Sequence, residues 1–327
     1  MCGKVFMEYT KLGKTGIEVS RIGFGVLTVG ATQQNVPPDK AGDLISYAME
    51  QGINFFDTAQ YYKTYPHLAA GLKKMPAGVK EPVIVSKCLD YTYTEMEQAI
   101  EEARIALNRD VIDIFLLHEV RTDGDFNLRI GAWEALQNAK TNGLVRAIGI
   151  STHHVDAAAQ MLDVPECDVV FPLINKDGLG IRKGHGSGTP EEMSRIIAAL
   201  SAQGKGIFAM KVFGGGNLTG SYRDCLNYVN DLPGIDSMMI GFGEKKEVDD
   251  AVDYIERKQP ADYQPDVTHK KIHIDTGDCE GCGTCITRCP NQAISMTEEG
   301  IAEVNHDVCL TCGYCAPVCP VRAIIMW

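Results

Sequence analysis

Eight of the twelve cysteines lie near the C-terminus with the spacing of metal ligands. They form two copies of C-x2-C-x2-C-x3-C-P, which begin at Cys279 and Cys309. Four thiolates hold a [4Fe–4S] cluster, and in this spacing the fourth cysteine of each copy ligates the other cluster. The sequence therefore predicts two clusters, one held by Cys279, Cys282, Cys285 and Cys319 and the other by Cys309, Cys312, Cys315 and Cys289.

Zinc is the alternative reading of these cysteines. A zinc ion needs four ligands but gains nothing from the swapped fourth cysteine or from the proline that follows it. Residues 272–327 resemble the two-cluster bacterial ferredoxins, which implies a small α+β domain and low-potential one-electron transfer in an anaerobic or strictly reducing cell. We expect the scattered Cys2, Cys88, Cys167 and Cys225 to be small apolar residues.

Three titratable residues directly follow apolar runs. The runs N-F-F-D, V-I-V-S-K and I-F-L-L-H end at Asp57, Lys87 and His118, and Tyr62 comes five residues after Asp57. We expect the Lys87 ammonium to lower the pKa of the Tyr62 phenol, and Asp57 to hold Lys87 in place. His118 could bond the substrate oxygen or relay a proton. Such a set protonates a carbonyl oxygen while hydride reaches its carbon.

The apolar runs alternate with amphipathic segments, which indicates repeated βα units. We expect helices over 94–108, opening with a capping box from Thr94 to Glu97, and over 190–203, opening with Thr189 to Glu192. A hairpin over 8–21 precedes them. Eight units in this length predict a (β/α)8 barrel, and the rival doubly wound sheet lacks a G-x-G-x-x-G motif. The expected strands are Ile22–Val26, Asn54–Asp57, Val83–Ser86, Ile112–Leu117, Ala147–Ile150, Val169–Leu173, Ile207–Met210 and Ser237–Ile240.

Residues 8–257 resemble the aldo-keto reductase family. The matching stretches are L-G-K-T-G-I-E-V-S-R-I-G-F-G at 12–25, G-I-N-F-F-D-T-A-Q-Y-Y at 52–62, V-S-K at 85–87, L-L-H at 116–118 and G-I-S at 149–151. The resemblance implies a (β/α)8 barrel with a nicotinamide cofactor across its carboxyl end. It also implies that Asp57, Tyr62, Lys87 and His118 form the catalytic tetrad.

The resemblance also points to cofactor residues, although with departures from the family pattern. Ser151 and Thr152 stand where the family has Ser-Asn at the nicotinamide, and Phe171 replaces the glutamine beneath the ring. The remaining expected contacts are Lys211 and Gly214 at the pyrophosphate and Gly241 and Lys245 near the adenosine. NADH and NADPH both stay open, and a flavin is a further option because it could link hydride transfer to one-electron clusters.

Chain length predicts the domain boundaries, and net charge narrows the classes of binding partner. We expect a barrel over 1–258, a linker over 259–271 and the ferredoxin-like domain over 272–327. A net charge of -12 argues against nucleic acid or an anionic membrane as partner. With no signal peptide and no membrane-spanning apolar run in the sequence, we expect a cytoplasmic protein.

Two functions of different classes follow. The first is an oxidoreductase acting on a small carbonyl or alcohol, with a redox protein as a further partner. The second is an electron carrier or docking protein whose barrel is catalytically silent. The glycine-rich segment 181–188 is expected to be either a lid over a pocket or a flexible excursion.

Overall fold

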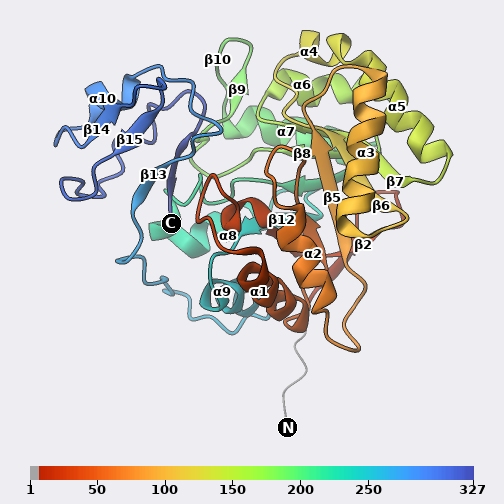
Figure 1. The fold of residues 1–327 in the computed structure, drawn as a ribbon, viewed down its shortest axis with the longest axis horizontal. Helices are drawn as coiled ribbons and strands as arrows, with labels where there is room; N and C mark the ends of the chain where they lie inside the picture. The colour runs from red at the N-terminus through yellow and green to blue at the C-terminus, as the bar shows by residue number, and fades with distance from the viewer. Residues whose placement is uncertain (1–6) are drawn as a thin grey trace.

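Eight parallel strands close into a barrel in the computed structural model, which describes residues 7–327 (Figure 1). Every expected strand is present, with ends within two residues of the prediction, so the predicted barrel is confirmed. The strands are β3 (Ile22–Gly25), β4 (Phe55–Asp57), β5 (Val83–Cys88), β6 (Ile112–Leu117), β7 (Val145–Thr152), β8 (Val169–Pro172), β11 (Gly206–Ala209) and β12 (Ser237–Gly241).

Helices surround the barrel and bury their apolar faces against it. They are α1 (Pro38–Glu50), α2 (Tyr65–Lys73), α3 (Tyr93–Leu107), α4 (Asp123–Leu128), α5 (Ile130–Thr141), α6 (Val155–Gln160), α7 (Pro190–Ala202), α8 (Tyr222–Asn230) and α9 (Lys245–Ile255), with short 3-10 turns η1 (Val26–Val29), η2 (Met161–Asp163) and η3 (Thr219–Ser221). No helix among residues 7–327 has the length and apolar character to cross a membrane.

Two capping boxes were predicted, and one was placed two residues too late. Helix α7 opens with Thr189 and Glu192 as expected. Helix α3, in contrast, is capped by Thr92 with Glu95 rather than by Thr94 with Glu97. Both pairs have the T-x-x-E spacing, so the sequence alone did not distinguish them.

An N-terminal hairpin closes one end of the barrel. Its strands β1 (Tyr9–Lys11) and β2 (Glu18–Ser20) pair antiparallel, as predicted. Leu12, Ile17 and Val19 are fully or almost fully buried and pack with the side chains that fill the barrel interior. The other end stays available for a site.

The C-terminal residues form a small domain that has its own hydrophobic core. Strand β13 (Ile272–Ile274) pairs with β16 (Ile324–Met326), and β14 (Ile294–Met296) pairs with β15 (Ala302–Val304). Helix α10 (Thr284–Arg288) lies between β13 and β14 in the chain. We call residues 272–327 the cluster module. In Figure 1 it is blue, with β13 and the C-terminus beside the barrel and α10, β14 and β15 further out.

Two other segments join the module to the barrel. The glycine-rich segment forms a short hairpin, β9 (Arg182–Lys183) with β10 (Gly186–Ser187), and Arg182 Nη1 donates to the Pro320 carbonyl at 2.8 Å. It is therefore attached to the module rather than extending freely. Residues 259–271 pack on the barrel, where Lys246 Nζ donates to the Tyr263 hydroxyl at 2.9 Å.

Candidate active site

Four polar residues meet at the carboxyl ends of β4, β5 and β6. Asp57 ends β4, Lys87 is the fifth residue of β5, His118 directly follows β6, and Tyr62 lies in the turn after β4. Neighbouring parallel strands bring their ends to the same rim, which is where sites of this fold form. The structure therefore brings together all four residues of the predicted tetrad.

Lys87 and Asp57 form a buried ion pair. The Lys87 Nζ lies 2.9 and 3.0 Å from the two Asp57 carboxylate oxygens and donates to the Thr58 carbonyl at 2.8 Å. The Lys87 side chain is fully buried. Burial lowers the pKa of Lys87, and contact with the Asp57 carboxylate opposes that shift. The same Nζ lies 4.4 Å from the centroid of the Tyr62 ring.

Tyr62 and His118 are joined at their polar ends. The Tyr62 hydroxyl lies 3.2 Å from His118 Nε2, and the two rings meet edge to face. Burial, followed by the nearby carboxylates of Asp57 and Asp278, raises the pKa of Tyr62 well above its usual value, so the expected lowering is wrong. Burial and nearby cations lower the pKa of His118. At neutral pH the pair is a protonated phenol and a neutral imidazole.

Two cavities meet at this point. The larger has a volume of about 590 Å³ and the smaller about 200 Å³. Both are lined by Leu27, Tyr62, Met210 and Lys211. Binding pockets for small molecules and cofactors usually enclose about 300–1,000 Å³. Tyr62 thus stands at the junction of a cofactor-sized space and a smaller one.

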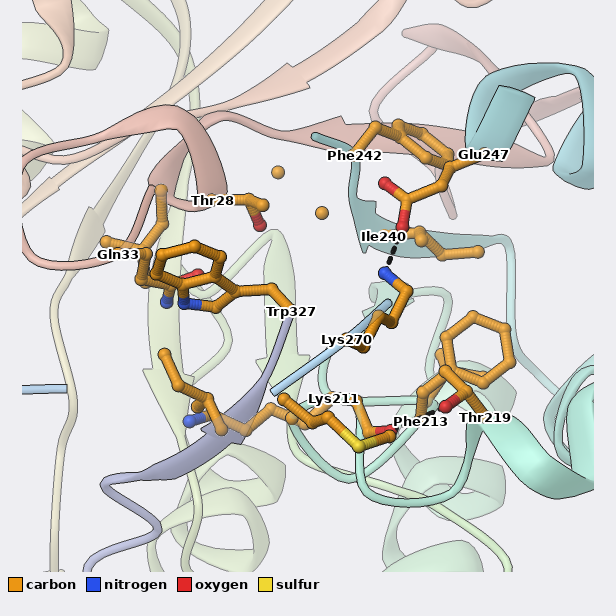
Figure 2. A pocket seen from close by; sticks show the side chains of 18 of the residues that line it. Thr28, Gln33, Lys211, Phe213, Thr219, Ile240, Phe242, Glu247, Lys270 and Trp327 are labelled. Carbon is orange, nitrogen blue, oxygen red and sulfur yellow. Dashed lines mark hydrogen bonds and ion pairs between the residues drawn. The ribbon is translucent and has the colours of Figure 1, made fainter. Parts of the chain in front are cut away.

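The larger cavity is lined by residues from Tyr62 to Asp250 of α9, and Figure 2 shows the part of it between Gln33 and Glu247. Phe171 lines it and stacks on Phe208 with ring centroids 4.3 Å apart. Figure 2 shows Trp327 beside Gln33 on one side of the cavity. On the other side Lys270, from the segment before the module, makes an ion pair with Glu247 of α9. The module and its preceding segment therefore form part of the cavity wall.

Not every expected cofactor residue lies in this cavity. Gly241 and Lys211 line it. Lys245 does not: its Nζ lies 4.5 Å from the centroid of the Tyr47 ring, and Lys246, paired with Asp250, lines the cavity instead. One residue along a helix turns the side chain by about 100°, so the two neighbouring lysines point to different surroundings.

Ser151 and Thr152 line the smaller cavity, not the larger one. The Ser151 hydroxyl accepts from the Glu119 amide at 2.8 Å, and the Thr152 hydroxyl accepts from the His154 amide at 2.9 Å. Both hydroxyls are thus engaged in holding the loops that follow β6 and β7.

The glycine-rich loop after β11 contacts the last strand of the module. Gly214 is not among the cavity residues, although its neighbours Gly215 and Gly216 are. The Met326 amide donates to the Gly215 carbonyl at 2.9 Å, and a Cβ on Gly216 would lie 2.2 Å from the Met326 carbonyl oxygen. Gly215 and Gly216, which follow Gly214, allow close approach of the last strand.

The module's cysteines gather in two groups of four. One small cavity is lined by Cys279, Cys282, Cys285 and Cys319, and another by Cys289, Cys309, Cys312 and Cys315. These are the two predicted ligand sets, so the donor set fits two [4Fe–4S] clusters with swapped fourth ligands. We call the first set the proximal cluster site, because Cys279 also lines the smaller cavity beside Tyr62.

A family model agrees with this geometry. Residues 21–237 match the aldo/keto reductase family. The chain belongs to that family. Residues 256–323 match the 4Fe-4S dicluster domain, so an aldo/keto reductase barrel is fused to an iron–sulfur domain.

Relatives of this aldo/keto reductase include named enzymes. An L-galactose dehydrogenase of Arabidopsis thaliana is 30% identical over 48% of this chain and 52% of its own length. A methylglyoxal reductase of Yersinia pestis is 26% identical over 51% and 61%. The chain thus spans about half the length of the curated relatives it matches. An aldo-keto reductase structure from Pseudomonas aeruginosa shares the fold, with a TM-score of 0.64, 24% identity and coverage of 76% of this chain and 94% of that one.

Several residues of the site were not predicted from the sequence. Trp327 and Lys270 reach the cavity only because the module docks on the barrel. Tyr61 lines the smaller cavity beside Tyr62 and donates a hydrogen bond to the Gly277 carbonyl of the module. No local pattern marks these positions.

Proposed function

We propose that this aldo/keto reductase reduces small polar carbonyl compounds, or oxidises the corresponding alcohols, with NADPH or NADH. The observation that carries the proposal is the place of the Tyr62 hydroxyl. It lies where the two cavities meet, 3.2 Å from His118 Nε2 and beside the buried Lys87–Asp57 pair. A proton donor at such a junction can serve a substrate in one cavity and a cofactor in the other.

The larger cavity fits a dinucleotide in size and in its basic groups. Lys211, Gly241 and Lys246 are the residues we assign to holding it. When bound, the nicotinamide supplies or receives the hydride. Both Lys211 and Lys246 face carboxylates, Asp278 and Asp250, so a phosphate must share these cations. The family match lends no support to a flavin in its place.

The proton steps belong to the tetrad. In reduction, Tyr62 donates its proton to the carbonyl oxygen as negative charge develops there. Its raised pKa ensures that the phenol carries this proton at neutral pH. Lys87 stabilises the phenolate that remains, and Asp57 holds Lys87 charged and in place. Neutral His118 orients the Tyr62 hydroxyl through Nε2. In oxidation Tyr62 takes the proton back.

The module is proposed to carry electrons. Its two groups of four cysteines would hold two [4Fe–4S] clusters, which transfer single electrons. We propose a redox protein as the partner that exchanges these electrons with the module.

The test is turnover of methylglyoxal by the purified anaerobic holoprotein with NADPH and with NADH. We expect nicotinamide oxidation in step with carbonyl loss, and a 10²–10⁴-fold lower kcat for Tyr62→Phe, since a general acid contributes about that factor. Tyr93→Phe is the matched control, because Tyr93 lines neither cavity, and it should keep kcat. Equal kcat for Tyr62→Phe and the unaltered protein would refute the role of Tyr62.

A further inference from the structure

The smaller cavity has walls from two domains. On the barrel side it is lined by Tyr62, Lys87 and His118. Facing them are residues of the cluster module, namely Gly277, Asp278, Cys279, Glu280 and Val321. A molecule whose oxygen reaches Tyr62 therefore has the module at its other side. We call residues 277–280 the wall loop.

The wall loop is fixed on the barrel by three contacts from separate barrel segments. The Tyr61 hydroxyl donates to the Gly277 carbonyl at 2.8 Å. Lys211 Nζ lies 3.7 Å from the Asp278 carboxylate, and an Arg121 Nη lies 3.6 Å from the Glu280 carboxylate. Exposed ion pairs of this length are weak singly. Together with the hydrogen bond, they give the loop one position over the cavity.

The Gly277 position shows how close this approach is. A Cβ built there would lie 2.9 Å from the Tyr61 hydroxyl and 3.3 Å from an Asp275 carboxylate oxygen. Asp275 in turn accepts a hydrogen bond from the Gln33 side chain at 3.1 Å. The loop is thus packed against the barrel rather than suspended above it.

We propose that the wall loop completes the substrate site, so that a small polar carbonyl compound is enclosed between Tyr62 with His118 on one side and Cys279 on the other. This rests on the proposed function for the orientation of the carbonyl group. The cavity of about 200 Å³ holds the volume of roughly seven liquid waters, at about 30 Å³ each. The charged side chains of Arg121, Lys211 and Glu280 on its walls favour a polar molecule.

A consequence follows for the proximal cluster. Cys279 belongs to the ligand set whose cavity adjoins this pocket, so a molecule bound at Tyr62 changes the surroundings of a cluster thiolate. Polarity and hydrogen bonding around a ligand sulfur alter the electronic properties of the cluster. Substrate binding therefore changes the electronic properties of the proximal cluster and leaves those of the other cluster unchanged.

The first experiment needs no variant. The holoprotein is photoreduced without nicotinamide, and its electron paramagnetic resonance spectrum is recorded with and without saturating methylglyoxal. We expect one of the two cluster signals to shift. Two unchanged signals overturn the proposal. Because no turnover is involved, this result is independent of whether Tyr62 is the proton donor.

The second experiment fills the pocket from the module side. Val321→Phe adds volume to the module wall, and Val308→Phe makes the same change at a module valine outside both cavities. We expect at least a tenfold higher KM for methylglyoxal in Val321→Phe, with the NADPH Kd unchanged, and no change in Val308→Phe. Equal KM values in the two variants overturn the proposal. If Val321→Phe loses iron, the proposal is judged by the electron paramagnetic resonance spectrum of the unaltered holoprotein with and without methylglyoxal.

Discussion

The Tyr61 hydroxyl donates a hydrogen bond to the backbone carbonyl of Gly277 at 2.8 Å. This contact joins the loop that carries Tyr62 to the residue two positions before the cluster ligand Cys279. Tyr62, the proposed proton donor, therefore lies next to the barrel residue that contacts the module near Cys279, a predicted cluster ligand.

Replacing Tyr61 by phenylalanine tests this contact. One hydrogen bond contributes about 0.5–1.5 kcal/mol net, so Tyr61→Phe should leave global stability nearly unchanged. Amide hydrogen exchange over 277–280 should nevertheless become faster, as measured by mass spectrometry on the holoprotein. Tyr93→Phe is the matched control, because the Tyr93 hydroxyl accepts a hydrogen bond from the Asn138 side chain and Tyr93 lines neither cavity. Equal exchange in the two variants would show that the contact does not hold the loop.

The barrel and the tetrad were predictable because both have local signals. Asp57, Lys87 and His118 each follow an apolar run, and parallel strands bring such positions to one rim. The cysteine sets follow from spacing alone. In these cases a short local pattern marks each residue, and a regular fold or a repeated motif brings the marked residues together.

Features that depend on docking were not predictable. A run of glycines allows backbone approach by a phosphate or by a strand equally well, and only the fold shows that Met326 lies against Gly216. Trp327 and Lys270 are far in sequence from the barrel strands whose cavity they line. The direction of the Tyr62 pKa shift likewise depends on burial, which residue types do not reveal.

The effects of replacing Lys87 and Asp57 on the unfolding free energy should be strongly coupled. Lys87→Met leaves the Asp57 carboxylate buried without its cation, which costs about 3–5 kcal/mol of unfolding free energy. The double variant Asp57→Asn with Lys87→Met should cost less than the sum of the single changes, since no lone charge remains. Urea unfolding of the holoprotein followed by circular dichroism measures both. Additive costs would contradict the buried pair.

The control for this cycle is the pair of Lys140 with Asp168. Its ammonium lies 2.6 Å from a carboxylate oxygen, but both side chains are partly exposed to solvent. Exposed pairs contribute about 0–1 kcal/mol. Lys140→Met should therefore lower the unfolding free energy by much less than Lys87→Met.

His118 should stay neutral in acid. Burial, followed by the nearby Lys87 ammonium, lowers its pKa well below 6.5. The unfolded chain takes up this proton near pH 6.5, so the stabilising contribution is complete above that pH and is lost as pH falls below it. The proton resonance of the His118 ring, assigned by its absence in His118→Asn, should titrate below pH 6.5. A midpoint at or above that value would contradict the burial argument.

The swapped ligation gives a prediction that separates the two clusters. Cys289 lies in the first cysteine motif but lines the cavity of Cys309, Cys312 and Cys315. Cys289→Ala and Cys312→Ala should therefore remove the same paramagnetic signal, each with loss of about half of the iron. Cys319→Ala and Cys282→Ala should remove the other. If Cys289→Ala removes the signal that Cys282→Ala removes, the ligand sets are wrong.

Because only the proximal set adjoins the pocket at Tyr62, Cys282→Ala should raise the KM for methylglyoxal, while Cys312→Ala leaves it unchanged.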